Sequence, residues 1–169
     1  VDELFDEDGM TLAEIAYALY SSAAKENNFE FIGFDACLMA TVETAAIARG
    51  YAKYLLASED LEPGGGWDYV WLRALSENPD MSGEELGIEI VETFTAYYKR
   101  SGDDTTLAVI DLAKIENVLE AMGTLMKACN AEFSPALFKK LSKSRNNTKT
   151  FGGGSPRDND CDMIDVADM

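Results

Sequence analysis

The sequence contains no histidine among its 169 residues, so it carries no side chain that ordinarily titrates near neutral pH. It is also poor in positive charge, with 14 Lys and Arg residues against 31 acidic residues and a net charge of −17. A surface this negative repels nucleic acid and anionic lipid, which argues against both as partners. It favours cationic partners or divalent metal ions, although the same charge also promotes solubility.

Long apolar runs are absent as well. None approaches the roughly 18 residues that a membrane-spanning helix needs, so no membrane span is expected. No signal-peptide pattern opens the chain. The three cysteines, Cys37, Cys129 and Cys161, match neither a disulfide framework nor the spacing of zinc ligands. Free thiols are therefore expected.

The whole sequence is 47% apolar, which is sufficient for one domain with a hydrophobic core. Apolar and β-branched runs predict strands at residues 29–34, 54–57 and 105–111. Helical spacing, capping boxes and Gly or Pro stops predict helices at 11–25, 39–49, 67–75, 82–100 and 113–131, and one that opens at 134–135. This alternation predicts an α/β fold with a largely parallel sheet flanked by helices. Three strands are few for such a sheet, so we expect the fold to be incomplete in this chain.

The first predicted strand ends at Asp35-Ala36-Cys37, where a helical pattern takes over. In open α/β sheets ligands bind at the carboxyl ends of strands. A helix that begins near Met39 would bring its N-terminal N–H groups beside the thiol and favour the reactive thiolate. The backbone N–H of Cys37 could then help to bind an oxyanion, as in a nucleophile elbow. The spacing alone is more typical of a small, buried structural cysteine than of a nucleophile.

Asp35 has two interpretations. Its carboxylate could cap the helix that follows Cys37 or close a turn. Alternatively, because residues two apart on an extended strand face the same side, Asp35 could hold a cationic substrate side chain next to the sulfur of Cys37.

The stretches "FIGFDACLMATVETA" and "LLASEDLEPGGGWDY" together resemble the clostripain family of cysteine peptidases, caspase-like enzymes that cleave after Arg or Lys. The likeness covers residues 11–71, and the tail "FGGGS…MIDVADM" is similar to the segment that follows the family's catalytic core. The resemblance implies a caspase-like fold. It assigns residues 1–150 to the nucleophile-bearing part of the peptidase domain. Residues 151–169 become a Gly- and Asp-rich loop that leads into a truncated downstream segment.

Carried over residue by residue, the resemblance makes Cys37 the nucleophile and Asp35 the carboxylate that receives the basic P1 side chain. The loop that flanks the specificity pocket then contains Ser58, Glu59, Pro63, Gly64, Gly65, Gly66 and Trp67. In some relatives an acidic residue stands between the two loop glycines, whereas this sequence has Gly65 there.

The family's general base is a histidine upstream of the cysteine, which this sequence lacks. Relatives mature by cleavage between the two residues, so an N-terminal chain of the same precursor could supply the histidine. The alternatives are a truncated sequence, or a catalytically inactive relative that acts as a binding or scaffold module. The resemblance thus implies a cysteine endopeptidase that acts on peptides or proteins with Arg or Lys at P1. Secretion or surface attachment, and a bacterial source, are expected from the family alone.

Calcium is the one cofactor that the resemblance leaves open, because some family members depend on it. The acidic lead-in Asp2, Glu3, Asp6, Glu7 and Asp8 hints at an EF-hand loop, but Ile15 occupies the position of the bidentate glutamate. A solvated acidic loop is the simpler interpretation, and no metal ligands are assigned. The glycine triplets at 64–66 and 152–154 lack the Lys and Ser or Thr of a phosphate-binding loop, which argues against a nucleotide site.

Overall fold

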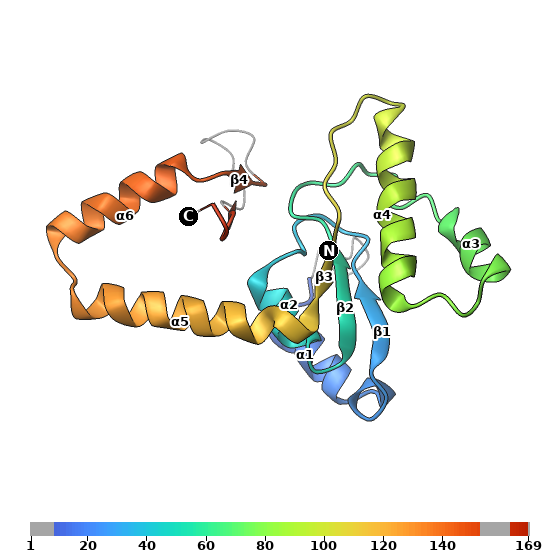
Figure 1. The fold of residues 1–169 in the computed structure, drawn as a ribbon, viewed down its shortest axis with the longest axis horizontal. Coiled ribbons are helices and arrows are strands. Elements are labelled where there is room, and N and C mark those ends of the chain that lie inside the picture. The colour runs from blue at the N-terminus through green and yellow to red at the C-terminus, as the bar shows by residue number, and fades with distance from the viewer. Residues whose placement is uncertain (1–8, 153–162, 169) are drawn as a thin grey trace.

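The computed structural model describes residues 9–152 and 163–168. They form a three-stranded sheet with helices on both faces, from which two further helices extend to one side (Figure 1). The strands lie in the order β1 (Phe29–Gly33), β2 (Ala52–Ala57) and β3 (Ala108–Asp111). β1 and β2 are parallel, whereas β3 pairs with β2 in the antiparallel sense. The predicted α/β fold is confirmed, and its small sheet is mixed.

The central strand β2 is buried because helices cover both of its faces. Leu55 and Leu56 point to opposite faces of the sheet and neither is exposed to solvent. Leu55 belongs to the cluster formed with α2 (Val42–Ala48), the 3-10 turn η2 (Leu112–Lys114) and the start of α5 (Ile115–Ala131). Leu56 belongs to the cluster formed with α3 (Trp71–Glu77) and α4 (Gly83–Lys99). Burying one leucine on each side fixes the register of β2 between the two helical layers.

Three predicted helix starts are confirmed by their caps. Ahead of α1 (Leu12–Tyr20), Thr11 and Glu14 form the expected capping box, in which the Thr11 N–H donates to the Glu14 carboxylate at 2.7 Å. Ser82 and Glu85 form the same box ahead of α4. Ser134 caps α6 (Pro135–Asn147), where proline occupies the first turn. These starts were predictable because each cap involves only residues three apart in the sequence.

Two other predicted starts are wrong by three or four residues. α2 begins at Val42 rather than near Met39, because the Thr41 hydroxyl accepts the Thr44 N–H and so caps the helix there. α3 begins at Trp71 rather than at residue 67. Residues 67–70 stay outside the helix because contacts with Asp35, described below, hold this stretch as a loop.

Shorter elements complete the described residues. A 3-10 turn, η1 (Ala23–Lys25), follows α1, so the predicted helix over residues 11–25 is divided in two. Near the end of the chain, β4 (Thr150–Phe151) pairs antiparallel with β5 (Met163–Ile164), which the sequence did not predict. β4 crosses the expected boundary between residues 150 and 151, and most of the predicted tail loop lies outside the described residues. That division of the chain therefore stays a prediction.

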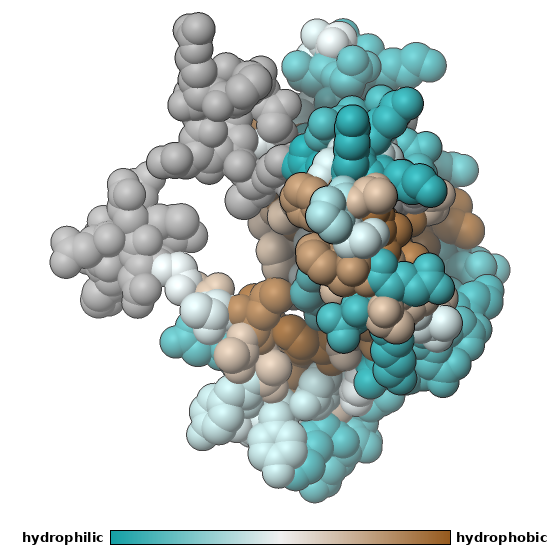
Figure 2. Space-filling view, turned by 90° about the vertical axis from the view of Figure 1, so that its left-hand side faces the viewer, coloured by the Kyte–Doolittle hydropathy of each residue, from teal (hydrophilic) through white to brown (hydrophobic). Residues whose placement is uncertain are grey.

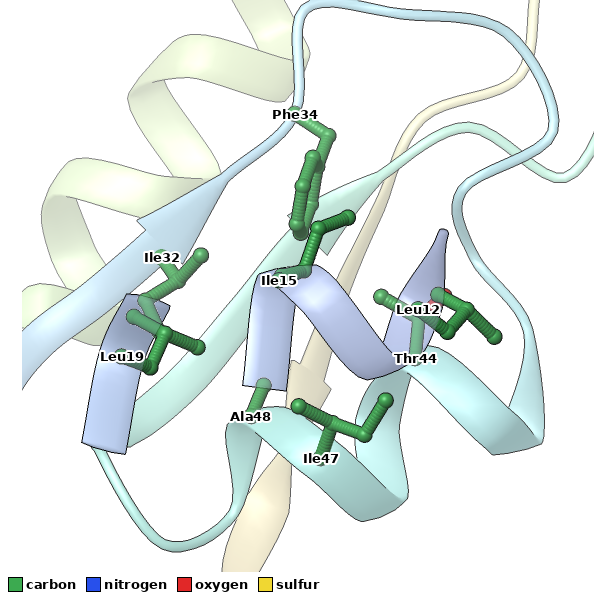
Figure 3. A pocket seen from close by; sticks show the side chains of 8 residues that line it. All are labelled: Leu12, Ile15, Leu19, Ile32, Phe34, Thr44, Ile47 and Ala48. Atoms are coloured by element: carbon green, nitrogen blue, oxygen red, sulfur yellow. The ribbon is translucent and has the colours of Figure 1, made fainter. Parts of the chain in front are cut away.

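A small apolar hollow lies where α1 packs against β1 and α2 (Figure 3). Leu12, Ile15 and Leu19 of α1 line one side of it. The polar lining residue Thr44 is already hydrogen-bonded to Thr41 at 2.9 Å. Because no free polar group converges on it, this hollow is a packing gap rather than a binding site.

α5 and α6 extend away from the sheet (Figure 1). Figure 2 faces the side on which they lie and shows hydrophobic residues gathered near the middle of that face, with hydrophilic residues around them. The exposed large apolar residues of these helices and of their connection are Val118, Leu125, Met126, Phe133, Phe138 and Leu141. Within the described ranges, no helix has the length and hydropathy needed to cross a membrane.

Ile90→Ala is expected to lower the free energy of unfolding by about 2–5 kcal/mol, because Ile90 is fully buried between α4 and the sheet. Ile88→Ala, on the same helix, is the matched control. Ile88 is 46% exposed, so its loss should stay below about 1 kcal/mol. Urea unfolding of the full-length protein, followed by circular dichroism, measures both variants. Equal losses would contradict the buried face assigned to α4.

Candidate active site

The candidate site lies at the carboxyl ends of the two parallel strands. The chain after β1 runs beside the chain after β2, and backbone hydrogen bonds continue between them beyond the strands. The Phe34 N–H donates to the Leu56 carbonyl at 2.9 Å, and the Leu38 N–H donates to the Asp60 carbonyl at 3.2 Å. Cys37 sits between these two bonds, in a turn where Leu38 has a positive φ of 63°. A leucine in this conformation is strained, and such strain is concentrated at functional sites.

The thiol of Cys37 is exposed and contacts the loop after β2. The backbone N–H of Glu62 donates to the sulfur at 3.1 Å, and the thiol donates to the Glu62 carbonyl at 3.7 Å. A helix N-terminus beside the thiol, which the sequence predicted, is not found, because α2 begins only at Val42. The backbone donor that lies against the sulfur is instead the N–H of Glu62.

The carboxylate of Asp35 anchors the same loop further along. One oxygen accepts the backbone N–H of Trp67 at 3.0 Å, and the other accepts the hydroxyl of Tyr69 at 2.8 Å. The interpretation of Asp35 as a helix cap is wrong, because Thr41 caps α2. Asp35 and Cys37 both face the loop of residues 61–69, which we call the site loop.

Gly66 is required where the site loop passes Asp35. Its φ is +64°, a conformation that glycine adopts without strain. A Cβ atom at this position would also lie 2.7 Å from an Asp35 carboxylate oxygen. Glycine therefore serves both the turn and the close approach of the backbone to the carboxylate.

Gly65 is required for a different reason, because a Cβ atom there would lie 2.7 Å from the hydroxyl oxygen of Tyr98. That hydroxyl donates to the Gly66 carbonyl at 2.8 Å and so ties the site loop to α4. No heavy atom lies within 4 Å of a Cβ built on Gly64, which faces open space. Tyr98 thus occupies the space that an acidic side chain at position 65 would need.

Ser58 and Glu59 open the connection that leads from β2 to the site loop. Ser58 is fully buried, and its hydroxyl donates to the Asp60 carbonyl at 2.9 Å and bonds the Thr106 hydroxyl at 2.7 Å. Ser58 therefore fixes the connection through its bonds to Asp60 and Thr106, and it makes no hydrogen bond to the thiol. Glu59 is half-buried next to it. Asp60 extends this anchoring, because its carboxylate accepts the Gly152 N–H at 3.0 Å.

Trp67 packs on the end of β1. Its side chain is 6% exposed, and its ring lies 2.7 Å from where a Cβ on Gly33 would be. The ring of Tyr69 is tilted against those of Trp67 and Trp71, with ring centroids 6.3 Å and 5.9 Å away. The indole nitrogens of both tryptophans are buried without a hydrogen-bond partner among the described residues. The end of the site loop is therefore packed by aromatic rings, and the indole N–H groups of Trp67 and Trp71 remain without an acceptor among the described residues.

Glu62 is a candidate site residue that sequence reasoning missed. Both of its carboxyl oxygens are buried, and neither has a hydrogen-bond partner among the described residues. Burial, and next the negative charge of Asp35, raise the pKa of Glu62 to about 7. The available signal was a carboxylate placed directly before the Pro63-Gly64 breaker, in a loop that returns over a strand end.

The other predicted features are found only in part. Cys37 and Cys129 are free thiols, as predicted, while Cys161 lies outside the described residues. The acidic lead-in considered for calcium, Asp2 to Asp8, also lies outside them. In the described part of the chain, no three His, Cys, Asp or Glu side chains cluster in a way that could hold a metal ion.

Comparison with solved structures defines the class. A secreted cysteine protease from Bacteroides thetaiotaomicron, in complex with an irreversible peptide inhibitor, is 25% identical with a TM-score of 0.54, over 68% of this chain and 33% of that one. A clostripain from the same species, in complex with the peptide inhibitor BTN-VLTK-AOMK, is 23% identical with a TM-score of 0.57, over 83% and 59%. An inactive zymogen protease from Parabacteroides distasonis is 17% identical with a TM-score of 0.58, over 93% and 54%.

The fold is thus that of caspase-like cysteine proteases, and this chain spans only 33–59% of the length of these three relatives. The sequence model of the Clostripain family matches residues 1–154, so the chain belongs to the clostripain family. A search of curated proteins finds no match.

Gly66→Ala is expected to lower the free energy of unfolding by about 1–3 kcal/mol, because alanine is strained at positive φ and its Cβ would push on Asp35. Gly64→Ala is the matched control in the same loop, and it should stay within about 0.5 kcal/mol. Urea unfolding of the two full-length variants gives the comparison. A neutral Gly66→Ala would show that Asp35 does not hold the site loop closely.

Proposed function

We propose that the intact protein is a cysteine endopeptidase that cleaves after Arg or Lys, with the sulfur of Cys37 as its nucleophile. One observation carries the proposal: an exposed thiol and a carboxylate, on Cys37 and Asp35, are held by the same loop at the end of a parallel strand pair. The thiol can attack a peptide carbonyl while the carboxylate receives a cationic side chain. That combination matches cleavage next to a basic residue.

In this reaction the thiolate of Cys37 attacks the carbonyl carbon of the scissile peptide bond and forms a carbon–sulfur bond. The backbone N–H of Cys37 helps to stabilise the resulting oxyanion. The carbon–nitrogen bond then breaks, and the leaving amine takes a proton from the general acid. Water attacks the acyl-enzyme, which releases the new carboxylate and restores the thiol.

A histidine from outside this chain supplies the acid and base. The sequence itself has none, and it spans about half the length of its solved relatives. One relative is described as an inactive zymogen, which supports a precursor in which cleavage precedes activity. We propose that the histidine lies on an upstream segment of the same precursor.

The basic preference at P1 has independent support. The peptide part of the inhibitor bound to the Bacteroides thetaiotaomicron clostripain, VLTK, ends in lysine. In this chain the carboxylates of Asp35 and Glu62 are the charges next to Cys37 that could receive such a side chain. Another relative is described as secreted, which supports a secreted or cell-surface bacterial protein here.

A second candidate function follows from the missing histidine. A relative without a general base would bind basic peptides at Asp35 without cleaving them and would act as a binding or scaffold module. The two candidates differ in turnover, not in binding. Assay of the full-length protein therefore separates them.

Cys37→Ala in the full-length protein is expected to lower kcat on Arg and Lys peptides by at least about 1,000-fold, because the reaction then has no nucleophile. Cys129→Ala is the matched control, since Cys129 lies on α5 away from the site loop, and it should keep wild-type activity. Fluorogenic peptides with Arg or Lys at P1 provide the measurement. Binding of these peptides by the wild type without turnover would support the second candidate instead.

Asp35→Asn is expected to lower kcat/KM for an Arg substrate by about 10- to 150-fold, because it removes a charge-assisted contact while keeping the size of the side chain. A substrate with norleucine at P1 never uses that charge and should lose much less. The decisive measurement is the ratio of the two kcat/KM values in wild type and variant. If both substrates lose equally, Asp35 acts only as the anchor of the site loop.

A further inference from the structure

The carboxyl group of Glu62 makes no hydrogen bond that would stabilise the fold of the described residues. Both oxygens are buried and have no hydrogen-bond donor among the described residues. The indole N–H of Trp67 lies close enough to lower the pKa of Glu62, yet its geometry does not complete a hydrogen bond. Leaving a buried carboxylate without a partner is costly, so a glutamate in this position needs a partner that the described part of the chain does not provide.

The groups around Glu62 are negative or neutral, so the partner that its carboxyl group lacks is a positive charge. The carboxylate of Asp35 acts on it from the end of β1, and Glu62 in turn acts on the hydroxyls of Tyr69 in the site loop and Tyr98 on α4. The sulfur of Cys37 contacts its backbone. No Lys or Arg of the described residues contributes to the pKa of Glu62. Burial, and next the negative charge of Asp35, therefore favour the protonated form of Glu62.

We propose that Glu62 is a second specificity-determining carboxylate, which holds a proton when the pocket is empty and gives it up to solvent when a basic P1 side chain enters. The proposal rests on the proposed function. It adds Glu62 to the residues that select a basic P1 side chain, and it adds the release of a proton on binding. The positive charge of the substrate takes the place of the proton. The net charge of the site, counted over both carboxyl groups and either the proton or the cation, is therefore unchanged. No bond other than this O–H bond is broken in the step.

The geometry suits this role. The backbone of Glu62 touches the sulfur of Cys37 while its side chain points toward Asp35, so a single residue joins the nucleophile to the cation receptor. Tyr98 fills the space beside Gly65, so the loop has no room for an acidic side chain at that position. Glu62 delivers the second negative charge from three residues earlier in the loop.

A specific pH dependence follows. Below a pH of about 7 a basic substrate must expel the proton of Glu62, whereas above it Glu62 is already charged and ready to bind. The ratio of kcat/KM for a Lys substrate over a norleucine substrate should therefore rise about 10- to 30-fold between pH 5.5 and 8.5. Titration of the nucleophile and the general base cancels in this ratio, because both substrates use them alike.

The test is this ratio in full-length wild type, Glu62→Gln and Glu92→Gln. Glutamine keeps the shape of Glu62 but holds no titrating proton, so Glu62→Gln should flatten the pH dependence and lower the ratio at pH 8.5 by about 10-fold. Glu92→Gln, on the exposed face of α4, should behave as wild type. A wild-type ratio that does not change with pH, or a Glu62→Gln profile equal to wild type, would overturn the proposal while leaving the peptidase function intact.

A second measurement does not depend on turnover. Calorimetric titration of full-length Cys37→Ala protein with benzamidine at pH 7, in two buffers of different ionisation enthalpy, counts the protons released on binding a cation. About half a proton per ligand is expected, because Glu62 is about half protonated there. The double variant that adds Glu62→Gln should release none, and uncharged benzamide should release none from either protein. Equal proton release from both proteins, or no binding of benzamidine, would refute the role of Glu62 even if no peptide were cleaved.

Discussion

The carboxylate of Asp35 holds the site loop against the end of β1, and the rest of the candidate site depends on this contact. Its two oxygens accept the Trp67 N–H and the Tyr69 hydroxyl, and it passes so close to Gly66 that no side chain fits there. The loop is fixed at Trp67. Five residues before Trp67, the backbone N–H of Glu62 contacts the sulfur of Cys37. A single charged group thus sets the distance between the thiol and the place where a cation can bind.

This arrangement also explains why the site is electrostatically unsatisfied. Asp35 uses its hydrogen-bonding capacity on the loop but not its charge, because neither the Trp67 amide nor the Tyr69 hydroxyl carries a positive charge. Glu62 adds a second carboxyl group that has neither donor nor cation among the described residues. A chain with a net charge of −17 disfavours adding more negative charge to its interior. A proton or an external cation would therefore stabilise the buried carboxyl group of Glu62.

Much of the fold was predictable from local sequence. The strands at β1 and β2 and the capped starts of α1, α4 and α6 follow from patterns that span a few residues. Asp35 and Cys37 were identified, but the expected helix beside Cys37 was wrong because Thr41 competes as a cap. Glu62 was missed since the negative charge that acts on it belongs to Asp35, which is far from it in the sequence. Local patterns cannot reveal a pKa that depends on such tertiary contacts.

The sheet also limits the side from which a general base can reach Cys37. Among the described strands β1 is an edge, paired only with β2, and Cys37 follows its carboxyl end. β3, the opposite edge, runs antiparallel to β2, so its carboxyl end points away from the thiol. For the proposed function, a histidine at the end of a strand fits a strand added parallel to β1 along its free edge. Such a strand would also cover Phe29, an aromatic residue that β1 leaves 48% exposed.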